Sequence, residues 1–93
     1  MREKARFLKM LGDETKLRII QCLLCGEVCA CKLVPVAERA QPTVSAHLND
    51  LERAGILESR RDGRNVYYKI RDARVFGLCK LMGIEKMDVV RGC

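Results

Sequence analysis

The most informative part of the sequence is residues 41–70, which read QPTVSAHLNDLERAGILESRRDGRNVYYKI. Pro42 favours a helix that begins here, because the first helical position tolerates a residue without a backbone N–H. An apolar stripe at helical spacing runs along this helix, and Gly55 predicts its end. The stripe consists of Val44, Leu48 and Leu51.

Two strands and a turn follow this helix. We expect strands at residues 56–61 and 64–70, because Asp62-Gly63 between them is a strong signal for a tight β-hairpin. The second strand alternates apolar and polar side chains, so one face of the hairpin should lie on the core. The side chains expected on that face are Val66, Tyr68 and Ile70.

Three helices are predicted before residue 41. The first spans residues 2–11 and ends at Gly12, and Asp13 is a good N-cap for the second, which Gly26 ends. A third helix follows Cys31. The residues expected to be buried are Leu17, Ile20 and Leu24 on the second helix, and Leu33, Val36 and Ala37 on the third, with Pro35 in its first turn or so.

A fifth helix, for which Asp72 is the expected cap, completes the fold, and residues 87–93 read as a loose tail. A helix, a helix-turn-helix and a basic hairpin in this order predict a mainly α fold with a β-hairpin wing (α+β), the winged helix-turn-helix. We expect residues 1–93 to form one such domain. The apolar residues of the fifth helix are Val75, Leu78, Cys79 and Met82.

Composition narrows the possible functions. Eighteen Lys and Arg residues against twelve Asp and Glu residues leave a net charge of +6, which favours a polyanionic partner such as nucleic acid. The apolar runs are far too short to span a membrane, and residues 1–9 do not resemble a signal peptide, so we expect a soluble, cytoplasmic protein. We predict no enzymatic activity, because the sequence has no Ser-His-Asp set, paired carboxylates or phosphate-cradling glycine loop.

Four motifs resemble those of the ArsR/SmtB family of metal-responsive repressors. They are LGDETKLRI at residues 11–19, QPTVSAHL at 41–48, LERAGIL at 51–57 and RRDGRNVYY at 60–68. The resemblance runs from about Phe7 to Val75 with its spacing intact, and it departs at Ala40, where the family often has a serine. It implies a homodimer that joins through the first and last helices and binds an inverted-repeat operator in double-stranded DNA.

The resemblance also implies which residues contact DNA. The helix that begins near Pro42 would enter the major groove, and the hairpin would contact phosphate or the minor groove. The expected contacts are Gln41, Thr43, Ser45 and His47 from the helix and Arg60, Arg61 and Arg64 from the hairpin. Two alternatives stay open: His47 is a packing residue at the flank of the stripe, or the arginines protect an edge strand by their charge.

Cys29 and Cys31 resemble the thiolate motif of family members that sense arsenite, antimonite, cadmium or lead. Thiolates prefer soft ions, and without a secretory signal reduced cysteines are the expected state. Residues i and i+2 point about 200° apart on a helix but to one side in an extended chain, so this pair needs extended or distorted backbone. The alternative is that both are small buried hydrophobic residues.

The third ligand is left open between Cys25 and Cys22, which lie near Arg18, whose charge would lower a thiol pKa. Cys79 is expected to pack in the core, and Cys93 could reach across a dimer. The zinc site that other family members build on the last helix is not expected. Its first position is Asp72, but Arg74 stands where a histidine is needed.

The sequence therefore predicts a transcriptional repressor that leaves its operator when a thiophilic ion binds its cysteines. The expected inducers are As(III) and Sb(III), with Cd and Pb as further candidates, and no permanent cofactor is expected. One alternative is a redox or persulfide sensor of the same fold that uses Cys22 with Cys25, or Cys79 with Cys93, as a disulfide switch. A second alternative is an architectural DNA-binding or adaptor protein with structural thiols.

Overall fold

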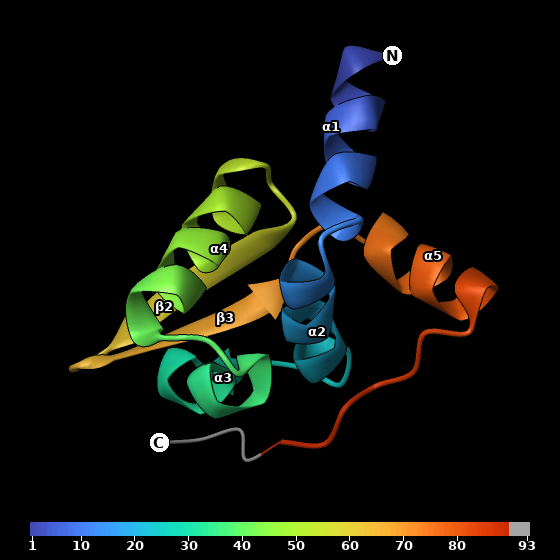
Figure 1. Cartoon of the computed structure of the whole chain (residues 1–93). Coiled ribbons are helices and arrows are strands. Elements are labelled where there is room, and N and C mark those ends of the chain that lie inside the picture. The colour runs from blue at the N-terminus through green and yellow to red at the C-terminus, as the bar shows by residue number, and fades with distance from the viewer. Residues whose placement is uncertain (90–93) are drawn as a thin grey trace.

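The computed structural model describes residues 1–89 of the chain, and its elements follow the predicted order (Figure 1). Five helices and three short strands form the fold. They are α1 (Arg2–Leu11), α2 (Glu14–Leu23), β1 (Val28–Cys29), α3 (Ala30–Ala37), α4 (Gln41–Arg53), β2 (Leu57–Asp62), β3 (Asn65–Ile70) and α5 (Arg74–Met82). The predicted winged helix-turn-helix is confirmed, with α3 and α4 as its two helices and β2–β3 as its wing.

The sheet has the order β1-β3-β2 and is antiparallel throughout. The wing strands pair from Leu57 with Ile70 to Asp62 with Asn65, which leaves Gly63 and Arg64 as the turn, one residue later than predicted. Gly63 has a φ of 64°, a conformation that favours glycine. The short strand β1 was not predicted from the sequence, and it joins the sheet beside β3.

The core is built around α4 and α2. The predicted stripe of α4 is confirmed, since Val44, Leu48 and Leu51 are all buried. On α2 the predicted face was partly wrong, because Leu17 and Leu24 are half-buried whereas Ile19 and Leu23 are buried beside Ile20. The reason is that α2 is packed against α1, α3, α4 and β3 together, so more than one stripe of it is covered.

The third helix begins earlier than predicted. It starts at Ala30 rather than after Cys31, and Pro35 therefore lies in its second turn. Glu38 ends the helix in the left-handed conformation, with a φ of 55°. This boundary places Cys29 in extended backbone and Cys31 in the first helical turn, which matters for the thiol pair described below.

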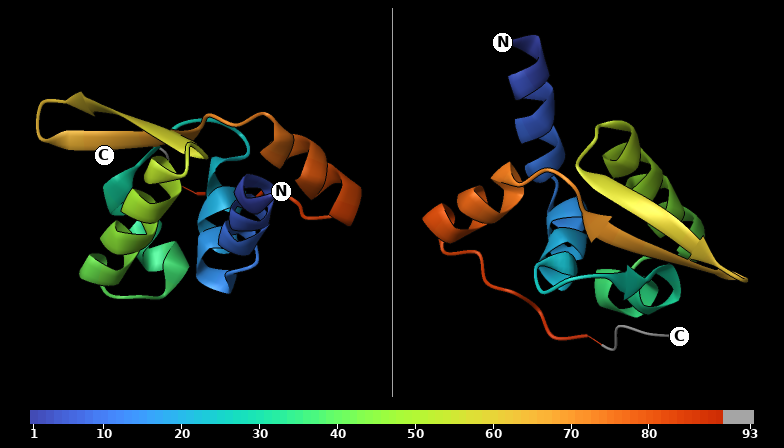
Figure 2. Two further views of the ribbon diagram at one scale, coloured as in Figure 1. Left: turned by 90° about the horizontal axis from the view of Figure 1, so that it is seen from above. Right: turned by 180° about the vertical axis from the view of Figure 1, so that it is seen from behind.

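The segment after α5 returns along the body of the molecule (Figure 2). Met87 donates its backbone N–H to the Gln21 carbonyl at 3.0 Å, and the Gln21 side chain donates to the Glu85 carbonyl at 3.0 Å. Met87, the first residue of the predicted loose tail, is therefore bonded to α2, while residues 90–93, with Cys93, lie outside the described part. None of the helices in residues 1–89 is long and apolar enough to cross a membrane.

The N-cap of α2 provides a test of the fold. The Asp13 side chain accepts a hydrogen bond from the Lys16 backbone N–H at 2.8 Å, and this bond is the main cause of its lowered pKa. Asp13→Ala should lower the free energy of unfolding by about 1 kcal/mol, whereas Asp13→Asn, which keeps an acceptor, should cost much less. Urea unfolding of the three proteins at pH 7 measures this, and equal stability of wild type and Asp13→Ala would contradict it.

The same N-cap predicts that the stability of the native state depends on pH. A carboxylate whose pKa is lowered on folding stabilises the native state above its unfolded pKa and loses that contribution as pH falls through the folded pKa. The advantage of wild type over Asp13→Asn should therefore shrink as the pH is lowered below the ordinary aspartate value of 3.8. Thermal unfolding of both proteins between pH 7 and the acid limit of folding measures this difference.

Candidate nucleic-acid interface and thiol pair

The first turns of α4 present an exposed polar face opposite the buried stripe. Gln41, Thr43 and Ser45 are all exposed there, as the sequence predicts. Ala40 is the N-cap of α4, and its methyl side chain cannot accept a hydrogen bond from the first turn. The backbone N–H groups at this end of α4 therefore rely on acceptors other than the cap side chain.

His47 lies differently from the other three predicted contacts. It is half-buried, and its Nδ1 is 3.0 Å from Nζ of Lys16 on α2. The same Nζ is 3.5 Å from the Asp50 carboxylate. This arrangement favours the packing alternative for His47, and it gives Lys16 a contact with α4 that the sequence did not predict.

The predicted wing arginines differ in whether their side chains are held by partners. Arg61 and Arg64 are exposed at and beside the turn. Arg60 instead forms a two-pronged ion pair with Glu27, at 2.8 and 2.7 Å, and its guanidinium lies 4.5 Å from the centre of the Tyr67 ring. The hydrogen bonds lower the pKa of Glu27 and raise that of Arg60. Arg60 is therefore held against the sheet, unlike the other two predicted wing contacts.

Cys29 and Cys31 lie side by side at the start of α3. Their Sγ atoms are 3.1 Å apart. Cys29 ends β1 in extended backbone (φ −65°, ψ 136°), and Cys31 follows in the first turn of α3, which is the distorted geometry the sequence required. Cys29 is 2% exposed, and Cys31 is exposed. Cys29 is disulfide-bonded, though not to Cys31, so a metal ion could use the Cys29 thiolate only after reduction.

A hollow of about 520 Å³ adjoins the two cysteines. Its walls come from the thiol pair, the first turns of α4 and the wing. Residues that line it include Cys29, Cys31, Gln41, Ser45, Arg64 and Tyr68. In addition, β1 pairs with β3 so that Cys29 lies opposite Tyr67. The thiol pair is thus adjacent to both elements that are expected to contact DNA.

The structure does not bring the predicted third ligands to this pair. Within residues 1–89, no group of three or more His, Cys, Asp or Glu side chains is arranged to hold a metal ion. Cys22 is buried, and its thiol donates to the Arg18 carbonyl at 3.3 Å. Cys25 is exposed and borders a second hollow against α5. Neither residue lines the hollow beside Cys29 and Cys31. A third ligand from Cys25 or Cys22 stays a prediction.

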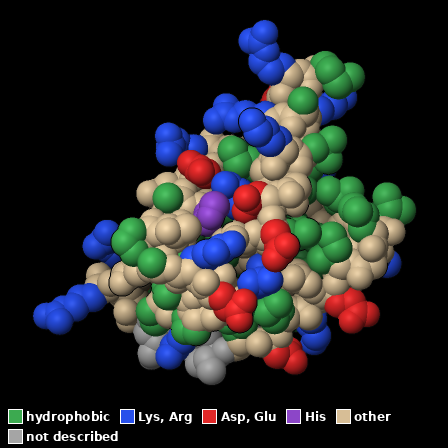
Figure 3. All heavy atoms as spheres, in the orientation of Figure 1, with side chains coloured by type: hydrophobic (Ala, Val, Ile, Leu, Met, Phe, Trp, Pro, Cys, Tyr) green, Lys and Arg blue, Asp and Glu red, His purple; other side chains and the backbone are tan. Residues whose placement is uncertain are grey.

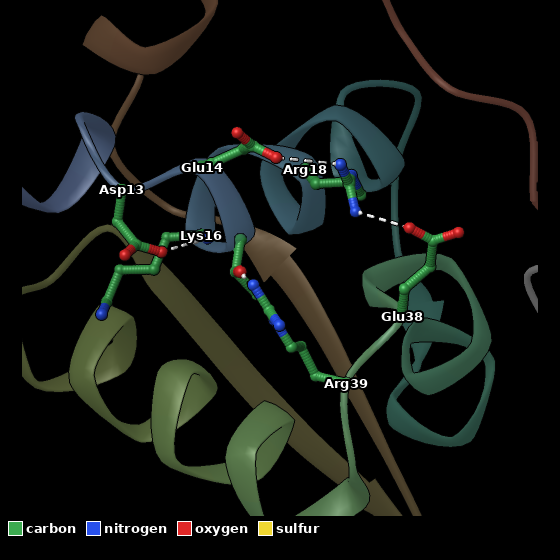
Figure 4. A network of polar contacts seen from close by, with 7 residues as sticks. Asp13, Glu14, Lys16, Arg18, Glu38 and Arg39 are labelled. Carbon is green, nitrogen blue, oxygen red and sulfur yellow. Dashed lines mark hydrogen bonds and ion pairs between the residues drawn. The ribbon is translucent and has the colours of Figure 1, made fainter.

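Two further expectations about the cysteines concern Arg18 and Cys79. The guanidinium of Arg18 pairs with two carboxylates, Glu14 and Glu38, each at 3.2 Å (Figure 4). Cys79 is buried as predicted, and burial raises the pKa of its thiol. Arg74, the first residue of α5, pairs with Asp72 at 2.7 Å.

The surface also has an apolar side. Within residues 1–89, the exposed large hydrophobic residues other than Met1 belong to α1 and α5, and Figure 3 shows hydrophobic side chains gathered along these two helices. Leu81 and Met82 are 83% and 67% exposed. Where the helices meet, Arg74 covers the Phe7 ring at 4.3 Å. Exposed apolar surface of this kind is typical of a contact with another molecule.

Comparison with known sequences identifies relatives along most of the chain. Residues 13–59 match the model of the bacterial regulatory protein family arsR. An uncharacterized HTH-type transcriptional regulator of Methanocaldococcus jannaschii is 40% identical over 84% of this chain and 89% of its own length. The cadmium resistance regulatory protein CadC of Listeria innocua is 36% identical over 81% of this chain, which spans 64% of that relative. An arsenical resistance operon repressor of Staphylococcus aureus is 36% identical over 77% of this chain and 69% of its own length.

Comparison with solved structures gives the same fold. HlyU from Vibrio cholerae superposes with a TM-score of 0.81 at 27% identity, over 87% of this chain and 88% of that protein. The homodimeric winged helix-turn-helix DNA-binding domain of Mb0332 from Mycobacterium bovis superposes with a TM-score of 0.79 at 30% identity. The superposition covers 89% of this chain and 77% of that chain.

Proposed function

This chain belongs to the arsR family of bacterial regulatory proteins, which are DNA-binding transcriptional regulators and not enzymes, and from that membership we propose that it is a metal(loid)-responsive repressor. The proposal has three parts: a DNA-reading surface, a dimer interface and an inducer site. The observation that carries it is the position of the thiol pair, which shares one hollow with the first turns of α4 and with the wing.

The DNA-reading surface is proposed to consist of the first turns of α4 and the tip of the wing. Gln41, Thr43 and Ser45 are exposed polar side chains that can bond base edges in a major groove. Arg61 and Arg64 are exposed cations at the wing that can bind phosphate or enter the minor groove. The net charge of +6 supports a polyanionic partner.

We infer that two copies join through α1 and α5. These helices carry the exposed apolar side chains, and burial of such a surface is the usual source of dimer stability. A chain of 93 residues also buries proportionately little surface by itself. A two-fold dimer would present two copies of α4, which fits an inverted-repeat operator with half-sites about one helical turn apart.

The inducer is proposed to be a thiophilic metal(loid) ion that binds Cys29 and Cys31 in their reduced form. Relatives named for arsenical and cadmium resistance support As(III), Sb(III), Cd and Pb as candidates. An ion bound there would alter the hollow shared with Gln41 and Arg64. Such an ion releases DNA because it binds the DNA-free conformation more tightly, and the coupling works in both directions.

A redox-sensing repressor of the same fold is the second candidate. Two observations favour it: Cys29 is disulfide-bonded, and Cys25 and Cys79 border the same hollow beside α5. Oxidation of either region would change the packing around the helices that position α4. The inducer experiment below separates this candidate from the metal(loid) sensor, because it is done with and without a reductant.

The DNA-reading surface predicts different effects for a base contact and a phosphate contact. The probe is a duplex selected from random sequence by the wild-type protein, with a scrambled duplex as control. Gln41→Ala should cost about 1–3 kcal/mol on the selected duplex and little on the scrambled one. Arg64→Ala should weaken both similarly and reduce the salt slope by about one. Equal losses on both duplexes for Gln41→Ala would remove it from the reading residues.

The proposed dimer interface predicts that a charge placed in it lowers the mass of the sedimenting particle. Wild type should sediment as a dimer, and Leu81→Glu should sediment as a monomer, because a charge replaces an apolar side chain in the contact. Lys80→Glu on the same helix is the matched control and should leave the mass unchanged, since Lys80 is exposed and already charged. Circular dichroism checks that both variants fold, and a folded, dimeric Leu81→Glu protein would contradict the interface.

The inducer site predicts loss of response without loss of DNA binding. With a reductant present, arsenite or cadmium should weaken wild-type binding to the selected duplex about 5–150-fold. Cys29→Ser and Cys31→Ser should bind the duplex normally and respond to neither ion. Cys25→Ser, Cys22→Ser and Cys93→Ser test the third ligand, and Cys79→Ser is the control for a buried thiol.

The outcome of that experiment decides between the two sensors. Absorbance at the thiolate-to-metal bands gives the stoichiometry of binding in the same samples. If Cys29→Ser still leaves the duplex on addition of arsenite, the pair is structural. If wild type responds only when the reductant is replaced by a mild oxidant, the redox candidate takes its place.

A further inference from the structure

Lys16 connects α2 to the recognition helix, and the proposed function gives it no role. It is only 9% exposed, although lysine is rarely buried without a partner. Its Nζ lies 3.0 Å from Nδ1 of His47 and 3.5 Å from the Asp50 carboxylate, both on α4. Figure 4 shows Lys16 extending from α2 toward α4. Because a buried ammonium must keep its partners, these contacts hold α4 in one position on α2.

The contact defines how the His47 ring is protonated. An ammonium group has only donors, so Nδ1 must accept with its lone pair, and the proton of the neutral ring is on Nε2. A second proton at Nδ1 would remove the acceptor and place two cations 3.0 Å apart. Histidine is the side chain whose charge ordinarily changes near neutral pH, and protonation of this ring would break the contact.

Other charges surround the contact. Asp13 caps α2 and its pKa is lowered, mainly by the hydrogen bond from the Lys16 backbone and also by the charges of Lys16 and His47. On α4 itself, Asp50 also pairs with Arg53 at 3.3 Å. From the segment before α4, Arg39 donates to Thr15, the neighbour of Lys16, at 3.4 Å. The two carboxylates would attract a protonated His47 as well, but they cannot restore the lone pair that accepts from Lys16.

We propose that Lys16 and His47 are positioning residues of the recognition helix, and that protonation of His47 releases α4 so that operator affinity falls as the pH drops. His47 then supports base reading through the angle of α4 on α2 rather than through its own contact with a base. This inference rests on the proposed contact of α4 with DNA. It also makes Lys16 necessary for sequence preference although its side chain is turned away from the reading face.

The sign of the pH effect tests the proposal. His47 is the one histidine in the chain. Between pH 7.5 and 5.5, at constant ionic strength, wild-type affinity for the selected duplex should fall roughly three- to tenfold, and affinity for the scrambled duplex should change less. Direct contact of His47 with phosphate predicts the opposite, because protonation would then strengthen binding to both duplexes. A rise in affinity at low pH would overturn the proposal.

Two variants isolate the contact. His47→Asn keeps an acceptor near the position of Nδ1 but does not titrate, so it should bind like wild type at pH 7.5 and stay constant to pH 5.5. Lys16→Met keeps a buried aliphatic chain, and it should lose preference for the selected duplex and also lose the pH dependence. If Lys16→Met does not fold, as judged by circular dichroism, Lys16→Gln replaces it. A pH response in either variant equal to that of wild type would refute the proposed contact.

A double-mutant cycle adds a test that does not depend on pH. If the two side chains act through each other, Lys16→Met with His47→Ala should lose about as much affinity as the worse single variant. Additive losses would mean that His47 acts independently, as a base-reading residue would. Failure of the wild-type protein to select any duplex would remove the proposed function together with this inference. Normal selection with a flat pH profile or additive losses would remove this inference alone.

Discussion

The buried stripe of α4 is the constraint on which the rest of the molecule depends. Val44, Leu48 and Leu51 are almost fully covered, by α2, by α3 and by the first strand of the wing. Because one face of α4 is committed to the core, the opposite face of its first turns must point to solvent. The exposed positions of Gln41, Thr43 and Ser45 follow from that packing, and the position of the wing beside α4 follows from the pairing of β2 with β3.

The thiol pair depends on the same core through the short strand β1. Val28 is fully buried and pairs with Tyr68, so the backbone that leads to Cys29 is fixed by the wing's own inner strand. The helix α3 begins immediately afterwards, and the change from strand to helix brings the two sulfur atoms together. A change in the geometry of these cysteines therefore cannot be confined to them. It must be taken up by β3, by α3 or by the hollow that they share with α4.

Local signals were sufficient to predict most of the fold. The helix boundaries at Gly12 and Gly55, the cap at Asp13 and the hairpin all depend on residues close in sequence, and these predictions were accurate to about one residue. The errors came from long-range contacts. β1 has only two residues and exists because β3 pairs with it, and Met87 is bonded to Gln21, far away in the chain. The rotated buried face of α2 reflects four neighbours that the sequence does not reveal.

At the candidate site, too, features set by nearby residues could be predicted and long-range contacts could not. Exposure of the first turns of α4 and extension at Cys29 could be predicted, because each follows from helical periodicity or from the i, i+2 spacing. The partners of the charged side chains could not, because Glu27 with Arg60 and Lys16 with His47 join residues about thirty positions apart. These two pairs matter for mechanism, since each ties an element expected to contact DNA to the body of the domain. A regulator that must change its DNA affinity by a small conformational shift needs ties of this kind, which are strong enough to define one arrangement and polar enough to be exchanged for another.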